Sequence, residues 1–298
     1  MVARRRPRML VWIGGGADLR ALIPHIAQFA AERDALVTFV EVIPESEMIV
    51  RPVAGHGWTV PTLARREALR RLDRAAARAR KAGLEPETRL LVGSPVQALA
   101  GEAGRRRHDF LVVATTRSRR QRALLGRLAR ESPSPLLVLH TGFRPRRLRV
   151  LVAIDISRPH APRRNALVAK LLEYARWFAE PRGRLHVLHA WDAYGTGFMR
   201  RGGASETEIK RYVAEVGRRR RRELEDAIVP FRRVVSARAI HLARGDPRDV
   251  IPQFARARDV DLVVVGTVAR GGLMRWIVGN TAESLLGTLR CSLLVVRP

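Results

Sequence analysis

The sequence predicts an α/β protein with two tandem domains, each built on an open parallel sheet of five strands. Apolar, β-branched runs alternate with helical segments along the whole chain, which is typical of parallel sheets with right-handed crossovers. Runs such as FLVVA (110–114) and DLVVVG (261–266) are almost continuously apolar, as expected for strands covered on both faces. A length of 298 residues suits two domains, which we place at 1–143 and 144–298.

An internal repeat supports this division. Segments 91–116 and 243–268 align without a gap, and each reads as a G-x-P helix start, about three helical turns, an Asp and a β-branched strand. The segments 9–16 and 150–157 also match, as do 134–140 and 292–298. A repeat of this length indicates a duplicated domain. The aligned pairs are Gly93 with Gly245, Pro95 with Pro247, Asp109 with Asp261 and Thr115 with Thr267.

In the first half, helix 60–82 shows the clearest periodicity. Leu69, Leu72, Ala76 and Ala79 form an apolar stripe with helical spacing, and arginines fill the other face. The remaining patterns predict helices at 18–33 and 94–107. They predict strands near 8–14, 35–43, 87–92, 109–115 and 135–140.

The second half repeats this order. Strands are expected at 147–155, 184–190, 234–242, 260–266 and 292–297. Helices are expected at 161–179, 205–228, 247–258 and 280–289. The linker 141–148 is short and basic, so we expect the two halves to pack against each other.

Composition narrows the class of protein. A hydrophobic content of 46% supports a packed core, and the single cysteine, Cys291, excludes an internal disulfide framework and suits a reducing compartment. The apolar run near the N-terminus, MLVWI, is too short for a signal peptide, and no run approaches the roughly 18 residues of a membrane span. We therefore expect a soluble, cytoplasmic protein with no membrane partner.

The net charge of +28 is unusual. The first 143 residues carry 25 basic and 13 acidic side chains and the remainder 31 and 15, so the excess is spread over both halves. Nonspecific binding to polyanions is expected from such a charge. The charge fits either a solvated, arginine-rich surface, which we favour, or a functional polyanion partner.

The segment GTVARGGLMRWIVGNTAE (266–283) is the strongest candidate for a ligand site. This glycine-rich segment joins the end of a strand to a helix start at Asn280 and Thr281. Backbone N–H groups and the helix dipole favour an anion there, and Asp155 ends the first strand of the same half. From spacing alone, a phosphate site and a simple turn with Asn280 as helix cap are equally good interpretations.

The sequence does not support other nucleotide-binding motifs, a metal site or a catalytic site. IGGGADL (13–19) lacks the last glycine of a dinucleotide fingerprint, and no GxxxxGK[ST] motif is present. His186 and His189 are spaced to face opposite sides of a strand, which disfavours a metal site. No residue pattern identifies a catalytic group.

The second half resembles a universal stress protein domain, and the whole chain resembles the tandem, E-type members of that family. The stretches GTVARGG, GNTAE and GDPRDVIP carry the resemblance, together with the nucleotide signature G-x2-G-x9-G-[ST]. Its four positions are Gly266, Ala269, Gly279 and Asn280, so the spacing holds at all four and the residue type at two. The resemblance implies a Rossmann-like fold of the adenine nucleotide alpha hydrolase-like kind.

The resemblance also implies a ligand, ATP, with Mg²⁺ as its companion ion. By analogy with nucleotide-binding members, Asp155 contacts the adenosine, with Ala153 and Ile154 beside it, and Ala190 lines the adenine site. Val265 precedes the signature. The phosphates would be held by Gly266, Ala269, Gly279, Asn280 and Thr281.

The first half departs from this pattern. Gly14 stands where Asp155 stands and Ala114 where Gly266 stands, and the loop in 115–127 is five residues shorter than its counterpart. We expect no nucleotide there and a structural role instead. Family members pair through their last strands, so the resemblance implies an intramolecular pseudo-dimer in which LLVLH (136–140) pairs with LLVVR (293–297); a homodimer of whole chains is also an expectation.

Three functions remain open at this point. The favoured one is a non-enzymatic stress-response protein that binds adenine nucleotide in its C-terminal half. The second is a stress protein without nucleotide that acts through protein or RNA contacts on its arginine-rich surface. The third, an enzyme such as a nucleotidyl transferase, is disfavoured because the HxGH-like and SGGxDS-like loops are missing.

Overall fold

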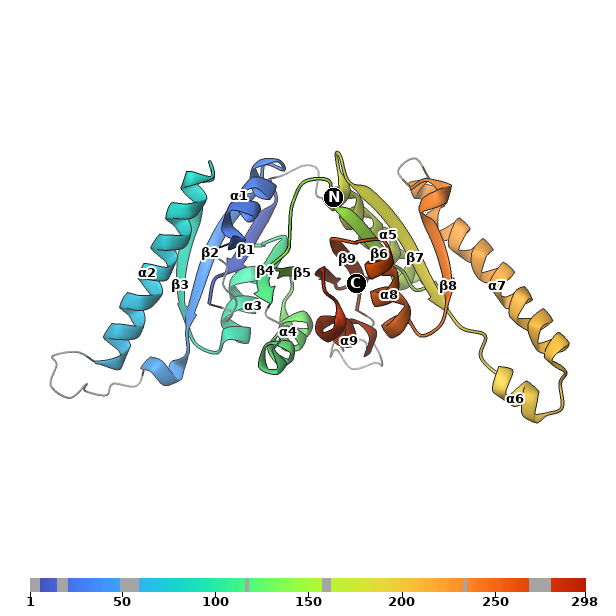
Figure 1. Ribbon diagram of the computed structural model, residues 1–298. Helices are drawn as coiled ribbons and strands as arrows, with labels where there is room; N and C mark the ends of the chain where they lie inside the picture. Colours follow the sequence, from blue (N-terminus) through green and yellow to red (C-terminus); the bar gives the residue numbers. More distant parts are fainter. Residues whose placement is uncertain are drawn as a thin grey trace. The chain divides into compact units, whose positions relative to one another are not determined.

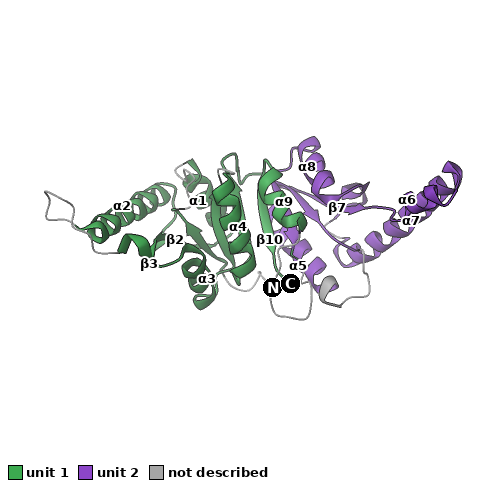
Figure 2. Cartoon of the chain, turned by 90° about the horizontal axis from the view of Figure 1, so that it is seen from below, with its two compact units in different colours: residues 1–146, 267–297 green, residues 147–266, 298 purple. Residues whose placement is uncertain are grey.

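The computed structural model describes residues 6–14, 21–48, 59–115, 118–156, 162–232, 235–267 and 280–298. In both halves of the chain, strands alternate with helices (Figure 1). The chain divides into two compact units (Figure 2). Unit 1 comprises residues 1–146 and 267–297, and unit 2 comprises residues 147–266 and 298.

The strands of unit 1 follow the order β3-β2-β1-β4-β5-β10. Strands β1 to β5 are parallel, and β10 is antiparallel to β5. The strands are β1 (Arg8–Trp12), β2 (Leu36–Ile43), β3 (Glu87–Val92), β4 (Phe110–Thr115), β5 (Leu136–His140) and β10 (Ser292–Val296). The helices are α1 (Ile23–Ala31), α2 (Val60–Lys81), α3 (Pro95–Arg105), α4 (Arg119–Glu131) and α9 (Asn280–Thr288), with a 3-10 turn at Glu45–Met48.

Unit 2 holds four parallel strands in the order β9-β6-β7-β8. They are β6 (Arg149–Ala153), β7 (Arg184–Trp191), β8 (Ile240–Arg244) and β9 (Leu262–Gly266). The helices are α5 (Pro162–Ala179), α6 (Thr196–Arg201), α7 (Glu206–Ile228) and α8 (Pro247–Ala257), with 3-10 turns at Val229–Phe231 and Ala237–Ala239. The expected α/β fold with five mainly parallel strands in each half of the sequence is therefore confirmed. The first half contains β1 to β5, and the second half contains β6 to β10.

The residues that recur in the repeat play the same structural roles in both copies. Asp109 and Asp261 each accept a hydrogen bond, at 2.8 Å, from the backbone N–H that opens the central strand, at Arg8 and Arg149. Gly93 and Gly245 have φ values of +134° and +137°, a conformation that side chains rarely adopt. These constraints explain why the residue types repeat without a gap.

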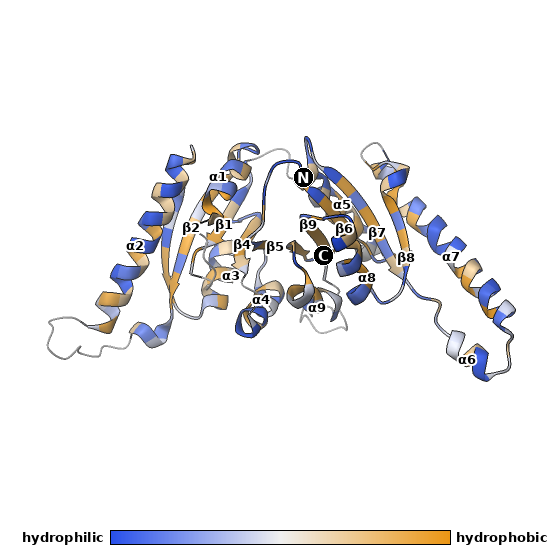
Figure 3. Ribbon diagram, viewed as in Figure 1, coloured by the Kyte–Doolittle hydropathy of each residue, from blue (hydrophilic) through white to orange (hydrophobic). Residues whose placement is uncertain are grey.

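The buried core of each unit is formed mainly by residues of its strands. Strand residues are mostly hydrophobic, whereas the outer faces of the long helices are hydrophilic (Figure 3). On α2 the buried residues are Ala68, Leu72, Ala75, Ala76 and Ala79. We expected Leu69 in this apolar stripe as well. This prediction was wrong, because Leu69 is 42% exposed. Small alanines on the buried face let α2 pack closely on β2 and β3.

Three further expectations need correction. The stretch 115–127, expected as a loop, contains the start of α4, whose cap is Ser118: its Oγ accepts from the Gln121 N–H at 3.3 Å. The short helix α6 was not expected. The strand expected at 234–242 begins only at Ile240, because Ala237–Ala239 form a 3-10 turn.

The pairing of last strands within one chain is confirmed. β5 and β10 are antiparallel, with Leu137 opposite Leu294 and Val138 opposite Leu293. The Ser292 hydroxyl accepts a hydrogen bond from the His140 N–H at 3.2 Å, and Arg297 Nη1 donates to the Ser132 carbonyl at 2.6 Å. This pairing explains why residues 267–297 belong to unit 1.

Candidate functional site

The carboxyl ends of β6 and β9 form the candidate site of unit 2. The strand order β9-β6-β7-β8 means that the chain leaves β6 on one side toward β7 and β8 and returns on its other side as β9. Ligands of open α/β sheets bind where the order reverses in this way. Ala153, the last residue of β6, lies opposite Val265 of β9 and Leu188 of β7.

Asp155 follows the switch point directly. Ile154 donates its N–H to the Leu188 carbonyl at 3.0 Å, so this backbone stays attached to β7 after β6 has ended. Ile154 is buried and Asp155 is exposed. Ala190, near the end of β7, lies opposite Ala243 of β8. Small side chains and one accessible carboxylate therefore occupy the strand ends that the sequence assigned to the adenosine.

Gly266 has a packing reason of its own. A Cβ at this position would lie 2.7 Å from Leu167 Cδ2 and 3.3 Å from Leu171 Cδ1, both on α5. A glycine therefore allows β9 to lie close to α5, whatever ligand the following loop holds. This packing role was not foreseen from the sequence, from which we expected Gly266 to serve in phosphate binding or in a turn.

Thr267 comes next and is almost completely buried. Its backbone N–H donates to the Val296 carbonyl at 2.9 Å. Its Oγ1 has no hydrogen-bond partner among the described residues, which is uncommon for a buried hydroxyl. An orphaned polar atom directly in the loop fits a site whose polar partner comes from a ligand.

The remaining residues that we expected at the phosphates are found in α9 or lie outside the described residues. Asn280 and Thr281 form the first turn of α9, as expected, and belong to unit 1. Asn280 is exposed and Thr281 half-buried. Ala269 and Gly279 lie outside the described residues.

His189 was missed as a site residue. It is 2% exposed, and its Nδ1 lies 3.0 Å from the Ile154 carbonyl. Burial lowers its pKa, although the hydrogen bond to Ile154 and the charge of Asp155 act in the opposite direction. A neutral ring facing a carbonyl carries its proton on that nitrogen, so Nδ1–H donates and positions the turn before Asp155.

His189 and His186 do have separate partners, as their spacing predicted. His186 Nδ1 lies 3.1 Å from Nε2 of His241 on β8. In the described part of the chain, no group of three or more His, Cys, Asp or Glu side chains is placed to hold a metal ion.

The same strand ends in unit 1 are filled. Glu41 of β2 occupies the position of His189, and a Cβ on Gly14 would lie only 1.9 Å from its Oε1. Glu41 is 1% exposed; its Oε1 accepts from the Val42 N–H at 3.0 Å and its Oε2 from Arg71 Nε at 2.9 Å. Trp12 stands where unit 2 has Ala153.

The end of β4, the counterpart of β9, is closed by a side chain. Gln121 Nε2 donates to the Ala114 carbonyl at 2.7 Å, and its Oε1 accepts from the Thr115 hydroxyl at 3.1 Å. Thr115 is the counterpart of Thr267, so the hydroxyl orphaned in the second half has a partner in the first. The shorter loop brings α4 close enough for this contact.

A model of the universal stress protein family matches residues 6–140 and again residues 147–297. Universal stress protein E of Escherichia coli K12 is 28% identical over 209 residues, covering 68% of this chain and 65% of that protein. Its homologue in Haemophilus influenzae is 28% identical over 173 residues, covering 57% and 54%. The chain thus spans about half to two thirds of these curated relatives.

Solved structures extend the likeness to the fold. A protein of unknown function from Pseudomonas aeruginosa matches with a TM-score of 0.67 and 24% identity, covering 98% of this chain and 93% of that chain. A universal stress protein from Archaeoglobus fulgidus matches with a TM-score of 0.67 and 17% identity, covering 97% and 96%. Among the described residues, no helix has the length and apolar character needed to cross a membrane. With both halves matched and the fold shared, the chain belongs to the universal stress protein family as a tandem member of the E type.

Proposed function

We propose that this chain is a stress-response protein that binds adenine nucleotide, ATP, in its C-terminal half and works as a binding protein rather than an enzyme. Membership of the family and the retained spacing of the loop 266–280 support this proposal. In the reducing cytoplasm, which the single cysteine favours, ATP is abundant enough to be its ligand.

One observation carries the proposal: the strand ends of the C-terminal half carry small side chains and an exposed carboxylate, whereas those of the first half carry large side chains. Ala153 and Ala190 stand where the first half has Trp12 and Val42. Asp155 is accessible, whereas its counterpart Gly14 lies against the Glu41 carboxylate. Small side chains that leave space for a base, together with an acceptor for the ribose hydroxyls, are what a site for adenosine needs.

The roles follow from chemistry. The Asp155 carboxylate accepts hydrogen bonds from the ribose, and the residues that line the base are Ala153, Ile154, Ala190 and Val265. The phosphates, with Mg²⁺ as counterion, are bound by N–H groups and hydroxyls of the loop and of the first turn of α9. The loop positions are Gly266, Thr267, Ala269, Gly279, Asn280 and Thr281; Thr267 joins this set because its buried Oγ1 is unpartnered among the described residues.

The test is a calorimetric titration of ATP into the full chain, after removal of bound nucleic acid. We expect one site per chain, and at least a tenfold loss of affinity in Asp155→Ala, which corresponds to about 1.4 kcal/mol. The matched control is Asp73→Ala, which removes an exposed acid from α2 in the first half and should leave the affinity unchanged.

Two results would contradict the proposal. Absence of binding heat in the wild type would mean that the loop holds no ATP. Release of AMP or pyrophosphate by the wild type and its loss in Asp155→Ala would make the chain an enzyme.

A further inference from the structure

Two aromatic side chains of unit 2 stand in solvent on the segment that joins β7 to α7. Tyr194 is 82% exposed and Phe198 is 74% exposed. Side chains of this size contribute most to stability when they are buried, so a neighbouring exposed pair needs an explanation. Phe198 belongs to α6, which lies beside α7 at the right of Figure 1.

The segment that carries these aromatic residues is held in place. Gly195 has φ of +93° and turns the chain into α6. The Tyr212 hydroxyl, on α7, donates to the Tyr194 carbonyl at 2.9 Å. Arg200 Nε forms an ion pair with Glu206 Oε1 at 2.8 Å, which ties the end of α6 to the start of α7. The exposed rings therefore stand on a fixed base.

Arginines without a carboxylate partner among the described residues lie on α6 and α7. Arg201 Cζ lies 4.6 Å from the centroid of the Phe198 ring. Along α7, spacings of seven and four residues place Arg211, Arg218 and Arg222 on one side of the helix, over roughly 16 Å. Glu215 lies in this row.

The arginines between Arg218 and Arg222, in contrast, form ion pairs. Arg219, Arg220 and Arg221 pair with Glu223 and Glu225. Arg201 and the three arginines of the row have no ion pair among the described residues. We call Tyr194, Phe198, Arg201, Arg211, Arg218 and Arg222 the α6–α7 surface.

We propose that the α6–α7 surface binds single-stranded RNA. Unpaired bases stack on exposed aromatic rings and on guanidinium planes, and the phosphates between them are neutralised by arginines. An RNA duplex offers phosphates but no free base faces, so it would use only the arginines. None of these six residues belongs to the proposed nucleotide site, and the two activities are therefore separable.

The experiment measures the fluorescence anisotropy of a labelled oligouridine of about 12 nucleotides with the full chain, freed of nucleic acid, at several salt concentrations. Replacing Tyr194→Ser and Phe198→Ser together should weaken binding about tenfold without changing the slope of log affinity against log salt. Both side chains are exposed, so the thermal midpoint and the ATP affinity should not change.

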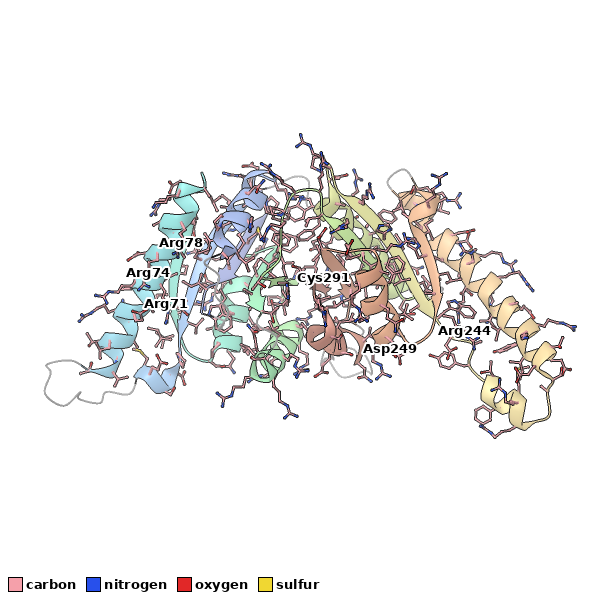
Figure 4. All side chains as sticks on the ribbon, in the orientation of Figure 1. Arg71, Arg74, Arg78, Arg244, Asp249 and Cys291 are labelled. Carbon is pink, nitrogen blue, oxygen red and sulfur yellow. The ribbon has the colours of Figure 1, made fainter. Side chains whose placement is uncertain are left out.

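A charge series complements the aromatic variant. Replacing Arg201→Gln, Arg211→Gln and Arg218→Gln together should weaken binding and reduce the salt slope by roughly two. The matched control replaces Arg65→Gln, Arg70→Gln and Arg78→Gln on α2; Arg78 is seen on that helix in Figure 4. This variant loses the same charge from the other half and should retain the wild-type affinity.

Several outcomes would overturn the proposal. These are an unchanged affinity in the aromatic variant, an equal loss in the α2 control, equal affinity for duplex RNA, or binding to anionic phosphatidylglycerol vesicles with none to the oligouridine. The first three would reduce the interaction to general electrostatics, and the last would make the surface a membrane contact.

Discussion

The strand ends of the two halves share a register but differ in several of the side chains at the switch point. In the first half, Trp12 and the ion-paired Glu41 fill this place, and a Cβ on Gly14 would require the Glu41 carboxylate to move. In the second half, Ala153 and neutral His189 occupy the same positions, and Asp155 is accessible. A duplicated fold therefore keeps its backbone constraints while a few side chains at its strand ends diverge.

The sharpest way to break this comparison is to give the first half the acid of the second. Gly14→Asp would place a Cβ 1.9 Å from Glu41 Oε1 and a second carboxylate beside a buried one. We expect a loss of about 3 kcal/mol in the free energy of unfolding, measured by urea denaturation. Adding Glu41→Ala should restore part of it; an unchanged stability in Gly14→Asp alone would show that Glu41 moves freely.

The ion pair that holds Glu41 gives the next largest effect. Arg71→Ala leaves a buried carboxylate without its cation, and we expect a loss of about 2 kcal/mol because Arg71 itself is half exposed. Arg74→Ala is the matched control on the same helix (Figure 4). Its partner, Glu67, is exposed and 3.6 Å away, so the change should stay within about 0.5 kcal/mol. Equal losses would mean that the helix and not the ion pair determines the result.

The two equivalent threonines sharpen the comparison further. Thr115→Val removes the donor to buried Gln121 and should cost about 1 kcal/mol of unfolding free energy. Thr267→Val removes a hydroxyl with no partner among the described residues and should be close to neutral in the absence of nucleotide. Thermal unfolding of the two variants measures the difference, and a larger loss in Thr267→Val would place a partner on that hydroxyl.

The smallest expected effect concerns pH. Burial, with the nearby His186 and Arg258, lowers the pKa of His241 to about 4, and burial with Arg258 and Arg184 lowers the pKa of His186. The unfolded chain thus binds more protons between about pH 6.5 and 4, so stability is full above this window and falls as the pH drops through it.

The first half has no counterpart of this pair, since Thr38 and Arg89 stand at these positions. His241→Gln should therefore flatten the dependence of the melting temperature on pH in this window. An equally steep dependence in the variant would assign the acid sensitivity to other groups.

The order of strands and helices could be predicted from the sequence because apolar runs and helix starts are local signals. The α4 helix was predictable too, because Ser118 is a good cap and Leu125 and Leu128 have helical spacing. The alignment of 115–127 with the glycine-rich loop of the second half led us to expect a loop instead. The contacts of Glu41 with Arg71 and of His189 with Ile154 were not predictable, because they depend on the register of segments far apart in the chain. A charged or polar residue within an apolar run, as in LVTFVEVI and LHVLHAW, was the available signal.

The antiparallel pairing of β5 and β10 has a consequence for how such a protein behaves in the cell. Two separate subunits joined along their last strands would part on dilution, and both would carry the same residues at every position. Strands of one chain meet at an effective concentration that the linker sets, whatever the abundance of the protein. Gene duplication within one chain thus lets the two copies diverge from each other, and it fixes their ratio at one to one.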